Sequence, residues 1–168
     1  KPKARDVTTE ETQFFVEASN LYLPSPGVVD GRHRVHIRTS QGQVSELNVL
    51  VPEGLTVSAV SGPVGSWQFD ADRGGLRLEI EPAQSQGFDV LVDTQRGLDP
   101  LPADVHLAPL TVADAYSEVG LVAVAFGPDA QSETLESKVM SAVNLGDFDA
   151  GLIADKQTVL HRVYRYGA

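Results

Sequence analysis

Apolar and polar residues alternate between residues 43 and 93, and this alternation predicts four or five short strands in succession. The alternating apolar sets are Leu47, Val49 and Val51; Leu55, Val57 and Ala59; Trp67 and Phe69; Leu76, Leu78 and Ile80; and Phe88, Val90 and Val92. Gly or Pro lies beside each set, and no helical period lies between them. Because a period of two places one strand face in a core and the other in water, the pattern predicts an antiparallel β-sheet.

Further strands are expected on both sides of this stretch. Residues 12 to 18 form a first strand, and residues 32 to 39 set Val35 and Ile37 on one face against basic residues on the other. Residues 119 to 126 are nearly all apolar, which predicts a strand buried on both faces, and residues 158 to 166 form a last strand. We therefore expect an all-β fold, an antiparallel β-sandwich of immunoglobulin-like or related type.

Turn-forming residues predict where the strands are interrupted. Residues 20 to 31 contain Pro24, Pro26 and two glycines, and we expect no regular element there. Residues 96 to 109 contain three prolines, which predicts an extended crossing or a sheet edge, since proline cannot donate to a strand ladder. Seven strands precede this Pro-rich stretch.

One segment favours a helix instead. Between residues 132 and 145, Leu135, Val139 and Val143 recur at every fourth position, Ser132 can cap the first turn, and Gly146 suits the position after the last turn. We expect one short helix there.

The chain length is consistent with a single domain. A chain of 168 residues buries about two-thirds of its unfolded surface, which is enough for one stable core. We expect residues 1 to 9 to be a flexible lead-in and residues 10 to 168 to be one β-sandwich domain, in which a sub-boundary could fall at 96 to 109.

Charge and composition exclude several partners and chemistries. The 13 Lys and Arg residues against 23 Asp and Glu residues give a net charge of −10, which repels nucleic acids and anionic lipid surfaces. We expect no nucleic-acid partner and no membrane insertion of this segment, because its apolar runs are too short. The chain has no cysteine, so disulfides, thiolate metal sites and cysteine nucleophiles are excluded.

The histidines and one acidic turn are the candidate metal ligands. His33 and His36 are three positions apart, so on one strand they point to opposite faces and do not converge on a metal. Asp70, Asp72 and the following Gly74 resemble the start of a calcium loop, but glycine stands where such a loop needs a fifth oxygen ligand. We expect a plain turn and no cofactor, with calcium at Asp70 and Asp72 as the alternative.

Motifs for catalysis are absent from the sequence. It contains no G-x-S-x-G nucleophile motif and no glycine-rich phosphate loop. A hydrolase whose carboxylates converge only in the fold stays open, with Asp70, Asp147 and Asp149 on different loops as examples.

Aromatic residues are the candidates for a sugar-binding platform, namely Trp67, Tyr116, Tyr164 and Tyr166. Trp67 alternates with Phe69 among apolar neighbours, so we expect a core tryptophan whose replacement by alanine costs about 3 to 5 kcal/mol. Tyr164 and Tyr166 share one face of the last strand. That face is a contact stripe if exposed, and it closes the sheet if buried.

The run from Val44 to Val57 in the sequence VSELNVLVPEGLTV, followed by Gly62, Trp67 and Leu76, resembles segments of large, mostly uncharacterised bacterial extracytoplasmic proteins built of successive β-sandwiches. The resemblance covers about residues 32 to 93. It implies a module of a longer periplasmic or surface chain, and it supplies no catalytic residue. We therefore expect a non-catalytic structural or interaction module whose partner is a protein or polysaccharide surface, with a carbohydrate-binding module as the alternative.

Overall fold

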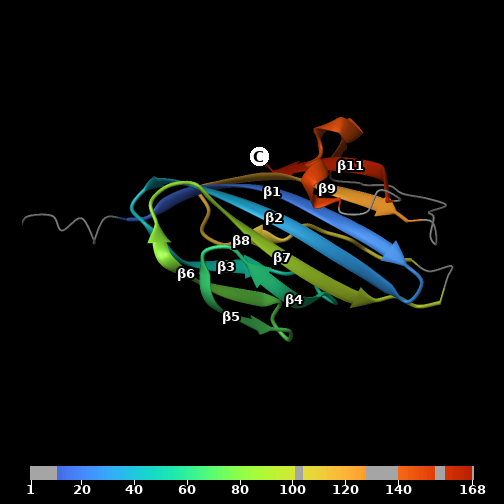
Figure 1. The fold of residues 1–168 in the computed structure, drawn as a ribbon, viewed down its shortest axis with the longest axis horizontal. Coiled ribbons are helices and arrows are strands. Elements are labelled where there is room, and N and C mark those ends of the chain that lie inside the picture. Colours follow the sequence, from blue (N-terminus) through green and yellow to red (C-terminus); the bar gives the residue numbers. More distant parts are fainter. Residues whose placement is uncertain (1–10, 101–103, 128–139, 154–157, 168) are drawn as a thin grey trace, which may run out of the picture.

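Two β-sheets packed face to face make up the computed structural model, which describes residues 11–100, 104–127, 140–153 and 158–167 (Figure 1). The strands are β1 (Gln13–Ser25), β2 (Val28–Gln41), β3 (Val44–Leu50), β4 (Thr56–Ser61), β5 (Val64–Asp70), β6 (Gly75–Gln84), β7 (Phe88–Gly97), β8 (Thr111–Val112), β9 (Ser117–Phe126), β10 (Ser141–Ala142) and β11 (Val159–Gly167). Two short 3-10 turns, η2 (Leu145–Asp147) and η3 (Ala150–Leu152), lie between β10 and β11.

The strands divide into a sheet of seven and a sheet of four. Sheet A has the order β10-β11-β9-β1-β2-β7-β4, and sheet B has the order β5-β6-β3-β8. The all-β sandwich is therefore confirmed, and the seven strands expected before the Pro-rich stretch are β1 to β7. One pairing differs from an antiparallel sandwich, because β1 and β9 run parallel.

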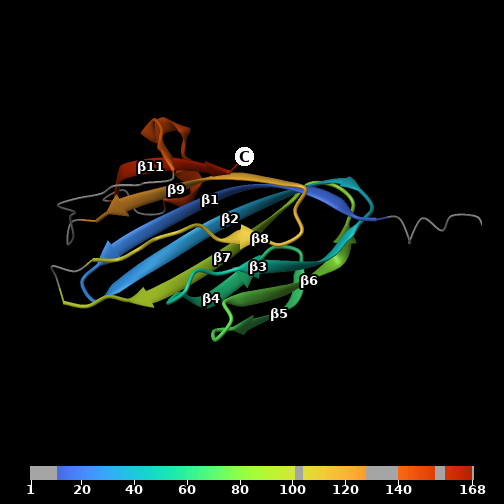
Figure 2. The ribbon, with the colours of Figure 1, turned by 180° about the vertical axis from the view of Figure 1, so that it is seen from behind.

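The parallel pair follows from the long connection between β7 and β9. After β7 the chain leaves sheet A, adds β8 beside β3 in sheet B, and returns to sheet A on the far side of β1 (Figure 2). Parallel neighbours need such a crossover, whereas a tight turn joins only antiparallel strands. Residues 96 and 97 end β7, and the described residues 98–100 and 104–110 hold no strand, so the expected crossing in the Pro-rich stretch is confirmed from residue 98 onward for the described residues.

The main core lies between the two sheets. We call the face of sheet A that packs on sheet B the inner face and the opposite one the outer face. Alternate residues of β1, β2 and β7, among them Val16, Ile37 and Val92, turn inward against Leu47 and Leu78 of sheet B. Ile37, Val92 and Leu78 are fully buried. The period of two in the sequence thus becomes the two faces of each strand.

A second apolar cluster lies on the outer face of sheet A. It joins Leu21 of β1, Ala123 and Ala125 of β9, and Val163 of β11 to Phe148 and Leu152. The last two residues belong to residues 143–153, which we call the cover segment, drawn in orange-red beside β9 and β11 in Figure 1. Strand β9 is therefore buried on both faces, as its nearly continuous apolar sequence predicts.

Two expectations about regular structure change in the light of the fold. The expectation of no regular element over residues 20 to 31 is wrong, because residues 20–25 belong to β1 and residues 28–31 to β2. Pairing of β1 to β9 ends at Tyr22, so Pro24 lies beyond the point where β1 has a neighbour on both sides, and a strand tolerates proline there. Most of the expected helix, residues 132–139, lies outside the described residues, as does the lead-in 1–9, while residues 141–142 are strand and a 3-10 turn begins at Leu145.

A buried polar chain crosses the inner face. His33, which is only 1% exposed, lies between two partners, with Nδ1 2.6 Å from Asn20 Oδ1 and Nε2 2.8 Å from Thr94 Oγ1. The backbone N–H of Leu110 donates to the same Asn20 oxygen, at 3.1 Å. That oxygen is an acceptor, so Nδ1 of His33 donates to it, Nε2 accepts from the Thr94 hydroxyl, and the imidazole is neutral.

The chain continues from Asn20 to the last strand. The Asn20 amide donates to the carbonyl of Leu121 at 3.2 Å and to the hydroxyl of Tyr166 at 3.1 Å. Burial raises the pKa of Tyr166 to about 12. Two glycines leave room for these groups, because a side chain at Gly31 would overlap Thr94 and His33, and one at Gly120 would overlap Tyr166. The polar chain therefore holds β1, β2, β7, β9 and β11 in one register.

We expect His33 to make the stability of the domain fall in mild acid. Burial lowers its pKa from 6.5 to about 3, so its contribution is complete above pH 6.5 and is lost as the unfolded histidine takes up a proton below that pH. From pH 7 to 5 the free energy of unfolding should fall by about 2 kcal/mol through this residue. Urea denaturation at pH 7, 6 and 5 measures it.

The control for this prediction is His106, an exposed histidine of the Pro-rich stretch. His106→Gln should keep the wild-type pH slope, whereas His33→Gln should flatten it. If His33→Gln does not fold, titration of the wild-type His33 ring by NMR gives the same information. A ring that takes up a proton near pH 6.5 would contradict the prediction.

Candidate functional site

The outer face of β2 carries a row of basic side chains. Because odd-numbered residues of this strand turn inward, Arg32, Arg34, His36 and Arg38 all project from the outer face. The basic outer face expected for this strand is confirmed. His33 and His36 lie on opposite faces, as their spacing predicts, and His33 is fully buried.

A groove of about 280 Å³ lies beside this row. Its floor is β7, with Leu91 and Asp93, and its two sides are β4, with residues 59–61, and the cover segment, with Gly151 and Leu152. Leu91 is 38% exposed although it is a large apolar residue. The groove thus joins apolar side chains from β4 and β7 to the guanidinium groups of Arg32 and Arg34.

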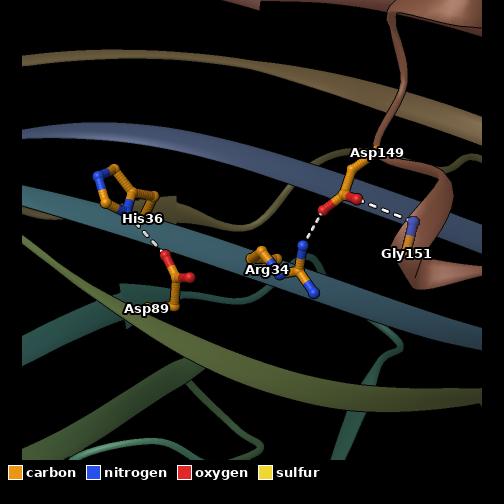
Figure 3. A network of polar contacts seen from close by, with 5 residues as sticks. All are labelled: Arg34, His36, Asp89, Asp149 and Gly151. Carbon is orange, nitrogen blue, oxygen red and sulfur yellow. Dashed lines mark hydrogen bonds and ion pairs between the residues drawn. The ribbon is translucent and has the colours of Figure 1, made fainter.

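The side of the groove formed by the cover segment is held by a fixed carboxylate. Asp149 precedes η3, and its Oδ1 accepts the backbone N–H of Gly151 at 2.9 Å, which caps the turn. Its other oxygen, Oδ2, is paired with Nη1 of Arg34 (Figure 3). Arg34 is therefore paired with a carboxylate that lies 115 positions further along the chain.

The neighbouring cations of the row have different partners. Arg32 donates through Nη1 to the carbonyl of Leu152 at 3.2 Å and forms no ion pair with any described residue. Asp93 of β7 lies opposite Arg32 in the strand register. Further along β2, Nδ1 of His36 lies 2.7 Å from Oδ1 of Asp89, as Figure 3 shows. Arg32 is therefore the groove cation without a direct carboxylate partner in the described chain.

The described residues of the groove include one side-chain hydroxyl group. Ser61 is a hydroxyl group at its border, and within the described residues it has no hydrogen bond to a histidine or a carboxylate. An activated nucleophile needs such a base. What the groove presents is an apolar surface with cationic donors along one side, an arrangement that recognises a carboxylate or a polypeptide.

The prediction that Trp67 is a core tryptophan is wrong. Trp67 lies on β5, the edge strand of sheet B, opposite Leu78 of β6, and it is 36% exposed. Alternation puts it on the same side of the sheet as the buried Leu78, but an edge strand has no neighbour to cover its free side. Val64 and Phe69 are the residues of β5 that pack against the core. Trp67 also borders a shallow depression of about 250 Å³ with Gln68 and Arg77.

The two C-terminal tyrosines lie on the packing side of their strand. Tyr164 is 9% exposed, and Tyr166 is half-buried with its hydroxyl bonded to Asn20. Both residues close the sheet, which is the second of the two outcomes expected for that face.

The structure gives the acidic turn a local role. Asp70 Oδ1 accepts the backbone N–H groups of Asp72 and Arg73, at 3.0 and 3.4 Å, as in an aspartate-stabilised turn. Asp70 lies on sheet B, whereas Asp147 and Asp149 lie in the cover segment on the other side of sheet A, so these three acids do not converge. Within the described residues no group of three or more His, Asp or Glu side chains could hold a metal ion.

One exposed aromatic residue stands out on the outer face. Tyr116, just before β9, is 69% exposed. Its N–H donates to the carbonyl of Phe14 at 2.8 Å, and its ring meets that of Phe15 edge-on at 5.3 Å. The guanidinium of Arg38 lies 4.7 Å from the Phe15 ring centre. Tyr116 is one of the four aromatic candidates for sugar binding, and its high exposure could be recognised only from the fold.

The chain matches no family model and no curated protein. Among solved structures, it is similar to an M1 zinc metallopeptidase from Deinococcus radiodurans, with a TM-score of 0.43 and 10% identity over 94% of this chain and 38% of that one. A point mutant of that enzyme gives a TM-score of 0.42 and 9% identity over the same shares. The chain thus spans well under half the length of these structures. In the described residues we find no helix with the length and hydropathy needed to cross a membrane.

We expect Trp67→Ala to cost about 1 to 2 kcal/mol, less than the 3 to 5 kcal/mol of an enclosed tryptophan, because solvent fills the space left at an edge and no cavity forms. Leu78→Ala, its fully buried cross-strand partner, should cost about 3 kcal/mol. Urea denaturation of both variants beside the wild type measures the difference. A larger loss for Trp67→Ala than for Leu78→Ala would show that Trp67 is part of the core.

Proposed function

We propose that this chain is a non-catalytic β-sandwich module of a larger extracytoplasmic bacterial protein, and that it contacts a partner protein through the outer face of sheet A. The observation that carries the proposal is the groove between β4 and the cover segment. Exposed apolar side chains and arginines meet there.

The composition of the groove supports a protein contact. Protein interfaces combine an apolar centre with arginine and a polar rim. Here Leu91 provides apolar surface at the centre, and Arg32, Arg34 and Asp93 surround it. On the outer face of sheet B, Arg77 is paired with two carboxylates, Glu46 at 3.0 Å and Glu79 at 3.1 Å, whereas Arg32 in the groove forms no ion pair with a described residue.

The extracytoplasmic placement rests on the strand-and-turn pattern of residues 32 to 93, which resembles segments of large bacterial proteins outside the cytoplasm. The absence of cysteine is compatible with that placement. A structural spacer would share the fold and the placement, but it would not need an exposed apolar groove.

A photo-crosslinking amino acid at position 91, introduced into the full-length protein in its bacterium, should give a discrete covalent adduct with a partner. We expect the adduct in the periplasmic or surface fraction, because Leu91 lies at the centre of the groove. Immunoblotting of the irradiated fractions detects it.

The matched control is Leu50, a comparably exposed leucine on sheet B. The same crosslinker at position 50 should give no discrete adduct. Equal adducts at both positions, or none at position 91, would contradict the contact surface, and an adduct confined to the cytoplasmic fraction would contradict the placement.

Tyr116 favours carbohydrate binding as a second candidate function. Flat aromatic rings that are rigidly held and exposed can stack on sugar rings, and Tyr116 is held by its backbone bond to Phe14 and its ring contact with Phe15. Arg38 next to Phe15 provides hydrogen-bond donors for hydroxyl groups.

In affinity electrophoresis through gels containing bacterial or plant polysaccharides, this second function requires retarded migration that Tyr116→Ala abolishes. Tyr164→Ala is unsuitable as a control because Tyr164 is buried, so Trp67→Ala serves instead as an exposed aromatic on the other sheet. Absence of retardation in every polysaccharide tested would leave Tyr116 without a role in sugar binding.

A further inference from the structure

We infer that the groove binds an extended acidic segment of the partner protein, whose carboxylate takes the place on Arg34 that Asp149 now occupies. This inference rests on the proposed function and names the chemistry of the partner.

The ion pair of Arg34 with Asp149 indicates that the guanidinium group binds a carboxylate. Its partner Asp149 does not come from a neighbouring strand but from the cover segment, which lies over the sheet. The Arg34 side chain keeps 35% of its surface exposed in that pair. A guanidinium offers five donors in a planar fork. Arg34 can therefore exchange Asp149 for another carboxylate that enters from the groove.

Arg32 supplies a second cation at a spacing that fits an extended chain. It lies two positions from Arg34 on the same strand face and forms no ion pair with a described residue. Side chains two positions apart in a strand are separated by roughly 6.5 to 7 Å, and the same spacing holds for alternate side chains of any extended peptide. A segment running along β7 would thus present alternate residues to Arg32 and Arg34.

The remaining residues of the groove define the other face of that segment. Ala59 of β4 and Leu91 of β7, both exposed, provide an apolar surface opposite the arginines, while Val60 packs against the main core. The expected partner segment therefore alternates acidic residues with small or β-branched apolar ones.

The charged residues near the groove determine its local net charge. Arg32 and Arg34 are positive, Asp93 and Asp149 are negative, and Asp89 is held by His36. Asp149 stays in the cover segment when a partner carboxylate takes its place on Arg34, so binding adds negative charge to the groove. Arg32, which forms no ion pair with a described residue, is the cation that balances it. The net charge of −10 acts weakly at this range, because physiological salt screens exposed charges beyond about 8 Å.

Fluorescence polarisation with two labelled seven-residue peptides tests the inference on the intact chain. The acidic probe is Thr-Glu-Val-Glu-Val-Glu-Thr, and the matched neutral probe has Gln in place of each Glu. We expect the acidic probe to bind at least about tenfold more tightly, since charge-assisted bonds to arginine are lost in the neutral one. Arg34→Gln should reduce binding of the acidic probe by about tenfold or more.

The decisive variant is Asp149→Asn, which should bind the acidic probe several-fold more tightly than the wild type, because the intramolecular competitor for Arg34 is gone. Asparagine still caps η3 by accepting the N–H of Gly151, so the cover segment stays in place. Asp147→Asn changes the same charge in the same segment, at an exposed position without a bond to Arg34, and should bind as the wild type does.

Three results would overturn the inference: equal binding of the two probes, no binding of the acidic probe to either the wild type or Asp149→Asn, and unchanged or weaker binding by Asp149→Asn. If any of these occurs while the crosslinker at position 91 still gives its adduct, the contact surface stands and the acidic partner is wrong. If the adduct is missing as well, both proposals fail.

Discussion

The structure depends on the burial of sheet A on both faces. Sheet B covers the inner face, and the cover segment covers part of the outer face through Phe148 and Leu152. A strand in such a position cannot hold exposed polar side chains, so β9 is almost wholly apolar. Where the cover segment ends, the outer face opens, and there the groove and the basic row of β2 lie. The candidate site is thus the border of the second apolar cluster.

The polar chain on the inner face adds order to this packing. Apolar contacts between sheets specify volume but tolerate sliding, whereas the bonds from Thr94 through His33 and Asn20 to Tyr166 require one relative position of the strands. Every described buried polar side-chain atom has a partner. A strand shift would leave several of them unsatisfied in the core, which is costly.

The strands could be predicted because alternation is a local property of the sequence, as for Leu47, Val49 and Val51. Which strands lie at the edge of a sheet could not be predicted, because no residue near Trp67 indicates that β5 has a neighbour on one side only. The site depends on a pair, Arg34 and Asp149, that are 115 positions apart. Sequence spacing carries no information on such a contact, although the basic outer face of β2 was visible as alternate arginines. The prediction of a break at Pro24 failed because a strand tolerates proline where it has a neighbour on one side only, and this depends on where the pairing of β1 with β9 ends.

The parallel pairing of β1 with β9 has a consequence for the order of folding. During synthesis, β1 can form its hairpin with β2 as soon as both are made, but its other edge stays open until residues 117 to 124 have emerged. An open central edge invites pairing with other chains, and contacts between distant residues form slowly. The nascent chain therefore passes through an interval in which its longest strands are exposed to aggregation, and the protection ends only when the C-terminal third arrives.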